Sequence, residues 1–357
     1  MIGKLYDTVL GMRFLRISLV AFFSCWALAA EALPEISYDS TANFLKLPDN
    51  IYLGEVAGVA TTSKGHIIVY TRTGTVALTE GTAYPYERGS SRLFEFDATG
   101  KYVREIAPGL YAYTFAQGVR VDAQDNIWIV DQGSNMILKM NPEGRVVMAM
   151  GRKPESVPNP ARPGGGGRAN KEGHIGAGLG SDVFNRPTDV AFDSQGDFFV
   201  ADGFGNSRVA KFNKDGVFLK SWGWKGSGQA EFNLPHSIAT DSHGNVYVAD
   251  QGNKRIQVFD NDGHFKTQIA NIGAPAAICI SSDSHEYLFS SNSNDPSNLD
   301  NGEIYKMELD GRVLGKFGRA GKIPKEFGSV NAIDCRSSSQ LYVGEIQNWR
   351  VQKLILH

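Results

Sequence analysis

Three polar side chains occupy equivalent positions in alternate copies of an internal repeat: Gln117, His236 and Asn331. One imidazole and two carboxamides can donate and accept hydrogen bonds, but they supply no fixed negative charge. In a sixfold ring, alternate copies are a third of a turn apart, so the three side chains are expected to converge on the axis. Convergence of this kind favours a ligand site, and the alternative is the ordinary polar lining of a water-filled channel. The other three copies carry small residues at this position: Ala57, Thr188 and Ala276.

The two clearest copies of the repeat run from Phe184 to Phe265. Phe184 matches Phe232 and Asp202 matches Asp250, and both pairs are 48 residues apart. A period of this size marks a repeat architecture. Each copy holds three strand signals and the start of a fourth, separated by Asp-x-x-Gly and Asp-Gly turns. Four short antiparallel strands in each copy are typical of one propeller blade.

Six copies can be counted, so the sequence predicts an all-β fold, a six-bladed β-propeller that spans residues 33–357 with four antiparallel strands in each blade. The sixth copy ends after its third strand, Arg350 to Leu356, which would leave an open sheet edge. The segment Ile36 to Leu47 has strand character, and we predict that it closes the ring as the missing strand. The alternative is a disordered tail left by processing.

Three long loops are expected to rise over one mouth of the channel. In a four-stranded meander, the loop between the second and third strands and the connection between blades lie on the same face. Loops 73–91 and 291–302 are of the first kind, and the Pro/Gly-rich insertion 153–183 is of the second. Loops held by a rigid scaffold are where function usually lies, so we favour function over simple tolerance of insertions.

Composition and the N-terminus bear on class and compartment. The net charge of −2 and the pI of about 6.4 give no basic excess for nucleic acid. Residues 1–32 are predicted to be a signal peptide, because basic residues precede an apolar run that ends at Ala30-Glu31-Ala32. The protein is then secreted or periplasmic, with no membrane span after cleavage, and we expect a monomer. The alternative is an uncleaved anchor helix.

Two cysteines remain after the predicted cleavage, Cys279 and Cys335. Export permits a disulfide between them. Two buried free thiols are the favoured interpretation, because nothing in the sequence places their Cα atoms close together.

The repeats resemble NHL repeats, and residues from about 54 to 357 resemble the peptidyl-α-hydroxyglycine α-amidating lyase family. The stretches that carry the resemblance are LGEVAGVA, DNIWIVD, RPTDVAF, ADGFGNSR and LPHSIA. The resemblance implies a lyase that cleaves peptidyl-α-hydroxyglycine to a peptide amide and glyoxylate. It further implies a zinc ion held by three channel histidines, a calcium ion nearby, and an arginine and a tyrosine that serve the substrate.

Position by position, the chain departs from that pattern. His236 matches one zinc histidine, but Gln117 and Asn331 stand at the other two. Arg72 matches the family arginine, whereas Phe204 stands at the tyrosine. Carboxamides are poor zinc ligands, and a phenylalanine cannot move a proton.

The calcium site departs as well, because Ala332 stands where the family has an aspartate, although Val59 and Val119 could still offer backbone carbonyls. We therefore predict no cofactor: zinc is not expected, and calcium could bind only weakly.

The sequence predicts a non-catalytic exported propeller that binds a small molecule, a peptide or a protein at the channel mouth. The residues expected to bind this ligand are Arg72, Gln117, Phe204, His236 and Asn331. One alternative is a divergent amidating lyase that uses another metal or none, and a second is a structural module of the cell envelope. The remaining motif residues have structural interpretations: Asp131, Asp202 and Asp250 cap turns, Arg208 and Arg255 pair within their blades, and His243 and His264 are solvated.

Overall fold

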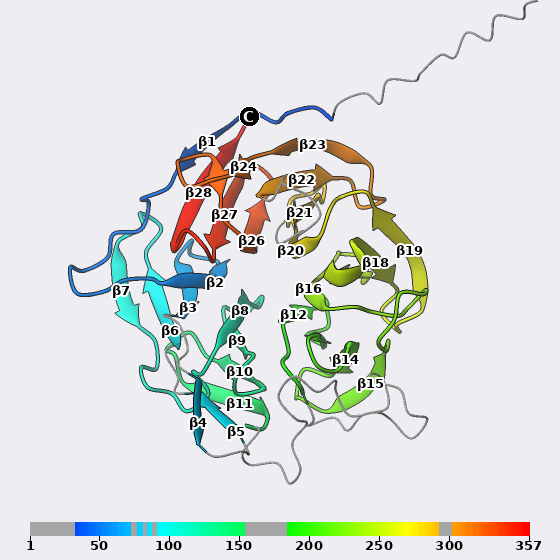
Figure 1. Ribbon diagram of the computed structural model, residues 1–357, viewed down its shortest axis with the longest axis horizontal. Helices are drawn as coiled ribbons and strands as arrows, with labels where there is room; N and C mark the ends of the chain where they lie inside the picture. The colour runs from blue at the N-terminus through cyan, green and yellow to red at the C-terminus, as the bar shows by residue number, and fades with distance from the viewer. Residues whose placement is uncertain (1–32, 73–76, 81–83, 88–90, 154–183, 293–301) are drawn as a thin grey trace, which may run out of the picture. The chain divides into compact units, whose positions relative to one another are not determined.

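The computed structural model describes residues 33–72, 77–80, 84–87, 91–153, 184–292 and 302–357. Leu33–His357 form one compact unit. In this unit, six four-stranded antiparallel sheets are arranged around a common axis (Figure 1). The prediction of a six-bladed, all-β propeller is confirmed. Within the described residues, no helix is both long and apolar enough to cross a membrane.

The strands of each blade follow the chain from the axis to the rim. Blade one has β2 (Glu55–Thr61), β3 (Ile67–Arg72), β6 (Ser91–Phe96) and β7 (Tyr102–Glu105). Blade two has β8 (Ala116–Val121), β9 (Ile127–Asp131), β10 (Met136–Met140) and β11 (Val146–Gly151). Blade three has β12 (Asp189–Phe192), β13 (Phe198–Asp202), β14 (Arg208–Phe212) and β15 (Phe218–Trp222). Blade four has β16 (Pro235–Thr240), β17 (Val246–Asp250), β18 (Arg255–Phe259) and β19 (Phe265–Ala270). Blade five has β20 (Pro275–Ile280), β21 (Leu288–Asn292), β22 (Glu303–Met307) and β23 (Val313–Phe317).

Blade six is completed from the other end of the chain. It contains β26 (Val330–Ser337), β27 (Gln340–Glu345) and β28 (Arg350–Leu356), and its outer strand is β1 (Tyr38–Thr41). β1 pairs antiparallel with β28, from Tyr38 opposite Leu356 to Thr41 opposite Lys353. This confirms the predicted closure, which removes the open edge of β28.

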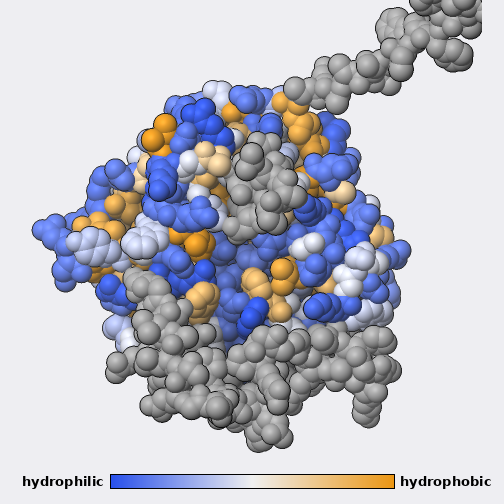
Figure 2. Space-filling view, viewed as in Figure 1, coloured by the Kyte–Doolittle hydropathy of each residue, from blue (hydrophilic) through white to orange (hydrophobic). Residues whose placement is uncertain are grey.

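The hydrophobic core is divided between neighbouring blades. Residues of β9, β13, β17 and β21 are buried throughout, because each second strand is covered by a blade on either side. Trp128 of blade two, for example, lies 4.8 Å from Phe198 of blade three, measured between ring centroids. The outer strands are instead mostly exposed or partly exposed, as expected for strands with one solvated face. The face shown in Figure 2 is polar near the centre of the ring, with hydrophobic residues scattered around it.

The repeated aspartates tie each blade to its own entry loop. Asp202 accepts hydrogen bonds from the Asn185 amide at 2.9 Å and from Arg208 Nε at 3.0 Å. Asp250 does the same with the Asn233 amide at 2.7 Å and Arg255 Nε at 2.8 Å. The predicted turn capping and pairing within the blades are confirmed. Asp131 likewise caps its turn by accepting from the Ser134 amide, and His243 and His264 are exposed as predicted.

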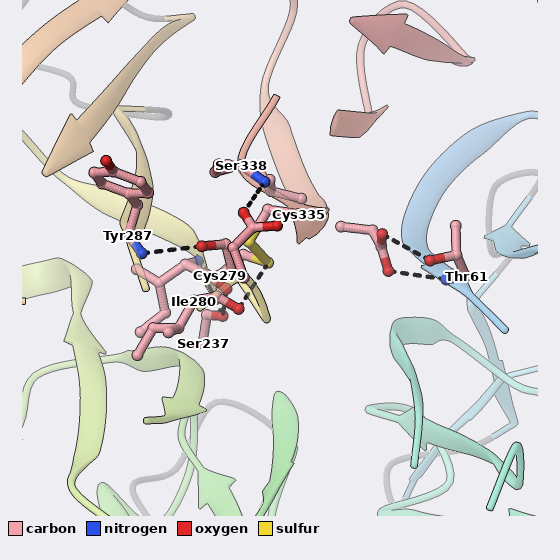
Figure 3. Close-up of a disulfide and its surroundings, with 12 residues drawn as sticks. Thr61, Ser237, Cys279, Ile280, Tyr287, Cys335 and Ser338 are labelled. Carbon is pink, nitrogen blue, oxygen red and sulfur yellow. Dashed lines mark hydrogen bonds between the residues drawn. A yellow bond between two sulfur atoms is a disulfide. The ribbon is translucent and has the colours of Figure 1, made fainter. Parts of the chain in front are cut away.

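The favoured interpretation of the cysteines is wrong, because Cys279 and Cys335 form a disulfide (Figure 3). Cys279 lies on β20 and Cys335 on β26, the inner strands of neighbouring blades, and their Cα atoms are 6.0 Å apart. The two residues are 56 positions apart in the chain, so only the packing of blades five and six brings them together.

Two further predictions concern loops. Loop 73–91 is not wholly irregular, because it contains a small hairpin of β4 (Ala77–Glu80) and β5 (Tyr84–Glu87). The predicted signal peptide 1–32, most of insertion 153–183 and most of loop 291–302 lie outside the described residues. Cleavage of the signal peptide and the gathering of the long loops over the mouth therefore stay predictions.

Candidate functional site

Irregularities in the pairing of the first and second strands of a blade direct the mouth residues toward the axis. The register between the first and second strands shifts at Ala57, Gln117, His236 and Asn331, so each of these residues has no partner opposite it. A bulge of this kind re-aims a side chain and is common beside functional sites. Tight packing around the axis accompanies the bulges: a Cβ on Gly58 would lie only 2.6 Å from the Val119 amide nitrogen.

The three polar side chains meet, as their alignment predicted: Gln117 and His236 hydrogen-bond to each other, and Asn331 donates to backbone carbonyls beside them. Gln117 Nε2 lies 3.1 Å from His236 Nε2, and His236 Nδ1 lies 2.7 Å from the Ala276 carbonyl oxygen. Since that carbonyl can only accept, Nδ1 carries the proton and Nε2 accepts from Gln117. Asn331 Nδ2 donates to the carbonyl of Ala57 at 2.6 Å and to that of Gln117 at 3.2 Å.

Burial holds the imidazole in its neutral form. His236 is almost wholly buried, and this burial lowers its pKa, with Arg72 adding a smaller repulsion. The hydrogen bond to Ala276 and the charge of Asp189 act in the opposite direction without reversing the shift.

Arg72 and Phe204 lie beside this cluster. Phe204 is half-buried and packs edge-on against His236, with 5.6 Å between ring centroids. Arg72 donates to the Ala116 carbonyl at 2.9 Å and pairs with Glu55, and its guanidinium lies 3.8 Å from the centre of the Phe115 ring. The structure thus brings all five predicted residues together, and whether they bind a ligand stays a proposal.

The space between these residues is small. The cavity lined by Gln117, His236 and Asn331 has a volume of about 10 Å³. That is close to the minimum volume that holds one water molecule.

The donor set does not suit zinc. The one imidazole already accepts an amide hydrogen at Nε2, and both amide nitrogens point their hydrogens toward acceptors. Among the described residues, no group of three or more His, Cys, Asp and Glu is placed to hold a metal ion. Zinc prefers imidazole, thiolate and carboxylate, so these residues do not fit it.

Exposed aromatic residues follow the same face of the ring. In the described part of the chain, the large exposed aromatics are Tyr52, Tyr111, Trp224 and Trp349. The first three lie in connections between blades, and Trp349 lies between β27 and β28, so the meander places all four on the mouth face. We call these four residues the aromatic rim.

A groove opens within this rim. Tyr52 and Trp349, which are 75% and 62% exposed, border a groove of about 200 Å³. Four aliphatic side chains line it, those of Leu45, Leu47, Leu53 and Val351, together with Asn43 and Arg350.

Comparison with known proteins agrees with the repeats. The profile of the NHL repeat family matches residues 184–212 and 232–259. The chain is a six-bladed β-propeller that contains NHL repeats. Its sequence is similar to that of amidating lyases, being 28% identical over 184 residues to peptidyl-alpha-hydroxyglycine alpha-amidating lyase 1 of Drosophila melanogaster.

These similarities cover parts of longer proteins. The match spans 49% of this chain and 30% of the Drosophila lyase. NHL repeat-containing protein 3 of Mus musculus is 31% identical over 193 residues, which cover 51% of this chain and 49% of the mouse protein. Relatives named for lyase activity and one relative named only for its repeats are thus about equally similar to this chain.

Solved structures support the fold alone. A streptogramin B lyase matches with a TM-score of 0.54 at 14% identity, over 90% of this propeller and 98% of that chain. A protein of unknown function from Bacteroides thetaiotaomicron matches with a TM-score of 0.60 at 13% identity, over 90% and 77% of the two chains.

The family resemblance pointed to Arg72, and the alignment of the repeats held a further signal for the same residue. Arg72 ends β3 where the other second strands end in Asp131, Asp202, Asp250, Asn292 and Glu345. Its replacement of an acidic or amide residue was a visible signal that blade one is specialised. Glu55 and Phe115, which hold Arg72, carried no such signal, because they contact it only through the packing of blades one and two.

Proposed function

We propose that this NHL-repeat propeller is an exported recognition module that binds a polypeptide partner across its mouth and does not carry out the lyase reaction. The observation that carries the proposal is the size of the central cavity, about 10 Å³, between polar groups that already hydrogen-bond to one another or to the backbone. A substrate could not approach His236 there without separating these hydrogen bonds.

The aromatic rim supports a polypeptide as the ligand. Tyr and Trp are enriched at the energetically important positions of protein interfaces. Here they are spread over several blades, which is a wider span than one small molecule would contact. The groove between Tyr52 and Trp349 is large enough for one apolar side chain, and Arg72, Gln117 and Asn331 offer polar contacts near the axis.

Export is part of the same proposal. The disulfide supports it, because such bonds persist in oxidising compartments and are rare in the cytosol. Mass spectrometry of the protein exported by its host should find a chain that starts at Leu33 or Ala30. An intact N-terminus would favour an anchor.

Selection from a random peptide library on the purified protein tests the binding site. Peptides selected on the wild type should bind the Tyr52→Ala/Trp349→Ala variant at least about tenfold more weakly. The control is Val217→Ala/Leu219→Ala, which removes exposed apolar side chains at the outer edge of blade three and should leave affinity unchanged. Selected peptides that bind both variants equally would place the site elsewhere.

An assay on an α-hydroxyglycine peptide tests the catalytic alternative. We expect no amide product. Product formed at a rate that falls in Arg72→Ala would show that the propeller is an enzyme.

A further inference from the structure

A partly buried arginine, whose side chain is 21% exposed, crosses the channel beneath the mouth. Arg120 lies on β8, and its guanidinium meets Asp189 of β12 in a two-pronged ion pair, with Nε at 2.9 Å from Oδ1 and Nη2 at 2.5 Å from Oδ2. Nη2 is also 3.2 Å from Ser237 Oγ of β16. These contacts join blades two, three and four.

The same guanidinium reaches two further blades. Nη2 lies 3.3 Å from the Ile278 carbonyl of β20, and Nη1 lies 3.5 Å from the Ile333 carbonyl of β26. One side chain therefore contacts oxygen atoms from four blades besides its own. The ring alignment makes Arg120 unusual, since the other inner strands carry Ala60, Ala191, Ala239, Cys279 and Asp334 at this position.

The carboxylate of Asp189 accepts further hydrogen bonds besides those from Arg120. Asp189 also accepts from the Val190 amide at 2.9 Å, from Ser237 Oγ at 2.7 Å and from the Ile238 amide at 3.1 Å. Burying a charge costs much free energy unless it is paired and hydrogen-bonded, and both members of this pair meet that condition. Burial by itself would lower the pKa of Arg120, but the attraction of Asp189 outweighs it and raises the pKa, so the guanidinium stays charged.

The atoms around Arg120 resemble the surroundings of a hard cation. A carboxylate, a hydroxyl and one backbone carbonyl surround Nη2, and a second carbonyl faces Nη1. Oxygen ligands of these kinds bind Ca²⁺ in proteins. We propose that Arg120 is a built-in cation that occupies this oxygen site, braces the inner strands and makes the ring independent of a metal ion in the channel.

Arg120 contacts the inner strands close to the mouth residues. Asp189 follows Thr188 and Ser237 follows His236 directly, whereas Ile278 and Ile333 lie two residues after Ala276 and Asn331. The contacts of Arg120 with these four residues fix the inner strands next to the bulges from which the mouth residues project. Arg120 is thus a positioning residue for the mouth.

Thermal unfolding in EDTA and in millimolar calcium chloride tests the proposal. The wild type should melt at the same temperature in both solutions. Arg120→Met leaves Asp189 buried without its partner, and its Tm in EDTA should fall by about 4–7 °C. Calcium should then raise the Tm of this variant, because the emptied oxygen site accepts the ion. Arg312→Met, which removes an exposed pair with Glu308, is the matched control and should change neither value.

Arg120→Lys keeps the test decisive if the methionine variant does not fold. An ammonium group retains the charge but not the two-pronged geometry, so this variant should melt below the wild type and show no response to calcium. A wild type stabilised by calcium would overturn the proposal. So would a methionine variant as stable as the wild type, or one destabilised but indifferent to calcium.

Discussion

Removing the disulfide between blades five and six should show how much it contributes to the stability of the propeller. The Cys279→Ala/Cys335→Ala variant opens a covalent loop whose ends are 56 residues apart. The chain-entropy relation gives about 14 cal/mol/K for a loop of this length, or about 4 kcal/mol of stability at 25 °C. For roughly 325 residues, the unfolding entropy is about 0.7 kcal/mol/K, so the Tm should fall by about 6 °C.

Calorimetry of the variant, the wild type and the wild type in reductant provides the assay. The reduced wild type should melt close to the variant, because both lack the same constraint on the unfolded chain. Two alanines also remove a little buried volume at β20 and β26, so the variant should melt slightly below the reduced wild type. Equal melting temperatures with and without reductant, with complete reduction verified by mass, would refute the reasoning.

Three further outcomes follow from the closure and the mouth. Deleting residues 33–48 removes β1, so it should lower the Tm and promote aggregation through the exposed edge of β28; an unchanged Tm would contradict the role of β1. Elemental analysis should find well under one equivalent of zinc, whereas Gln117→His/Asn331→His should create zinc affinity, measurable by calorimetric titration, by supplying three imidazoles. The pKa of His236 is lowered below 6.5 in the folded state, so the unfolded chain binds more protons and stability should fall as the pH drops below about 6.5. His236→Gln should reduce this slope in chemical denaturation measured across that range.

Much of the architecture was predictable because it is encoded locally. The Asp-x-x-Gly and Asp-Gly turns lie between strands only a few residues apart, and their recurrence defined the blades. Aligning these copies was enough to place Gln117, His236 and Asn331 at equivalent points, and the ring symmetry then brought them together. The strand character of Ile36 to Leu47 and the missing fourth strand of blade six predicted the closure for the same reason.

Other features depend on contacts between blades, which no local pattern encodes. The disulfide joins positions 56 residues apart, and Arg120 reaches Asp189, 69 residues away. Whether such groups meet depends on how neighbouring inner strands pack around the axis, and on the bulges that shift their register. The sequence by itself determined the repeat, the blades and the polar ring of the mouth. Only the tertiary structure decided that these polar groups hydrogen-bond to one another or to the backbone and that a guanidinium lies beneath them, because these distances are set by the packing of six blades.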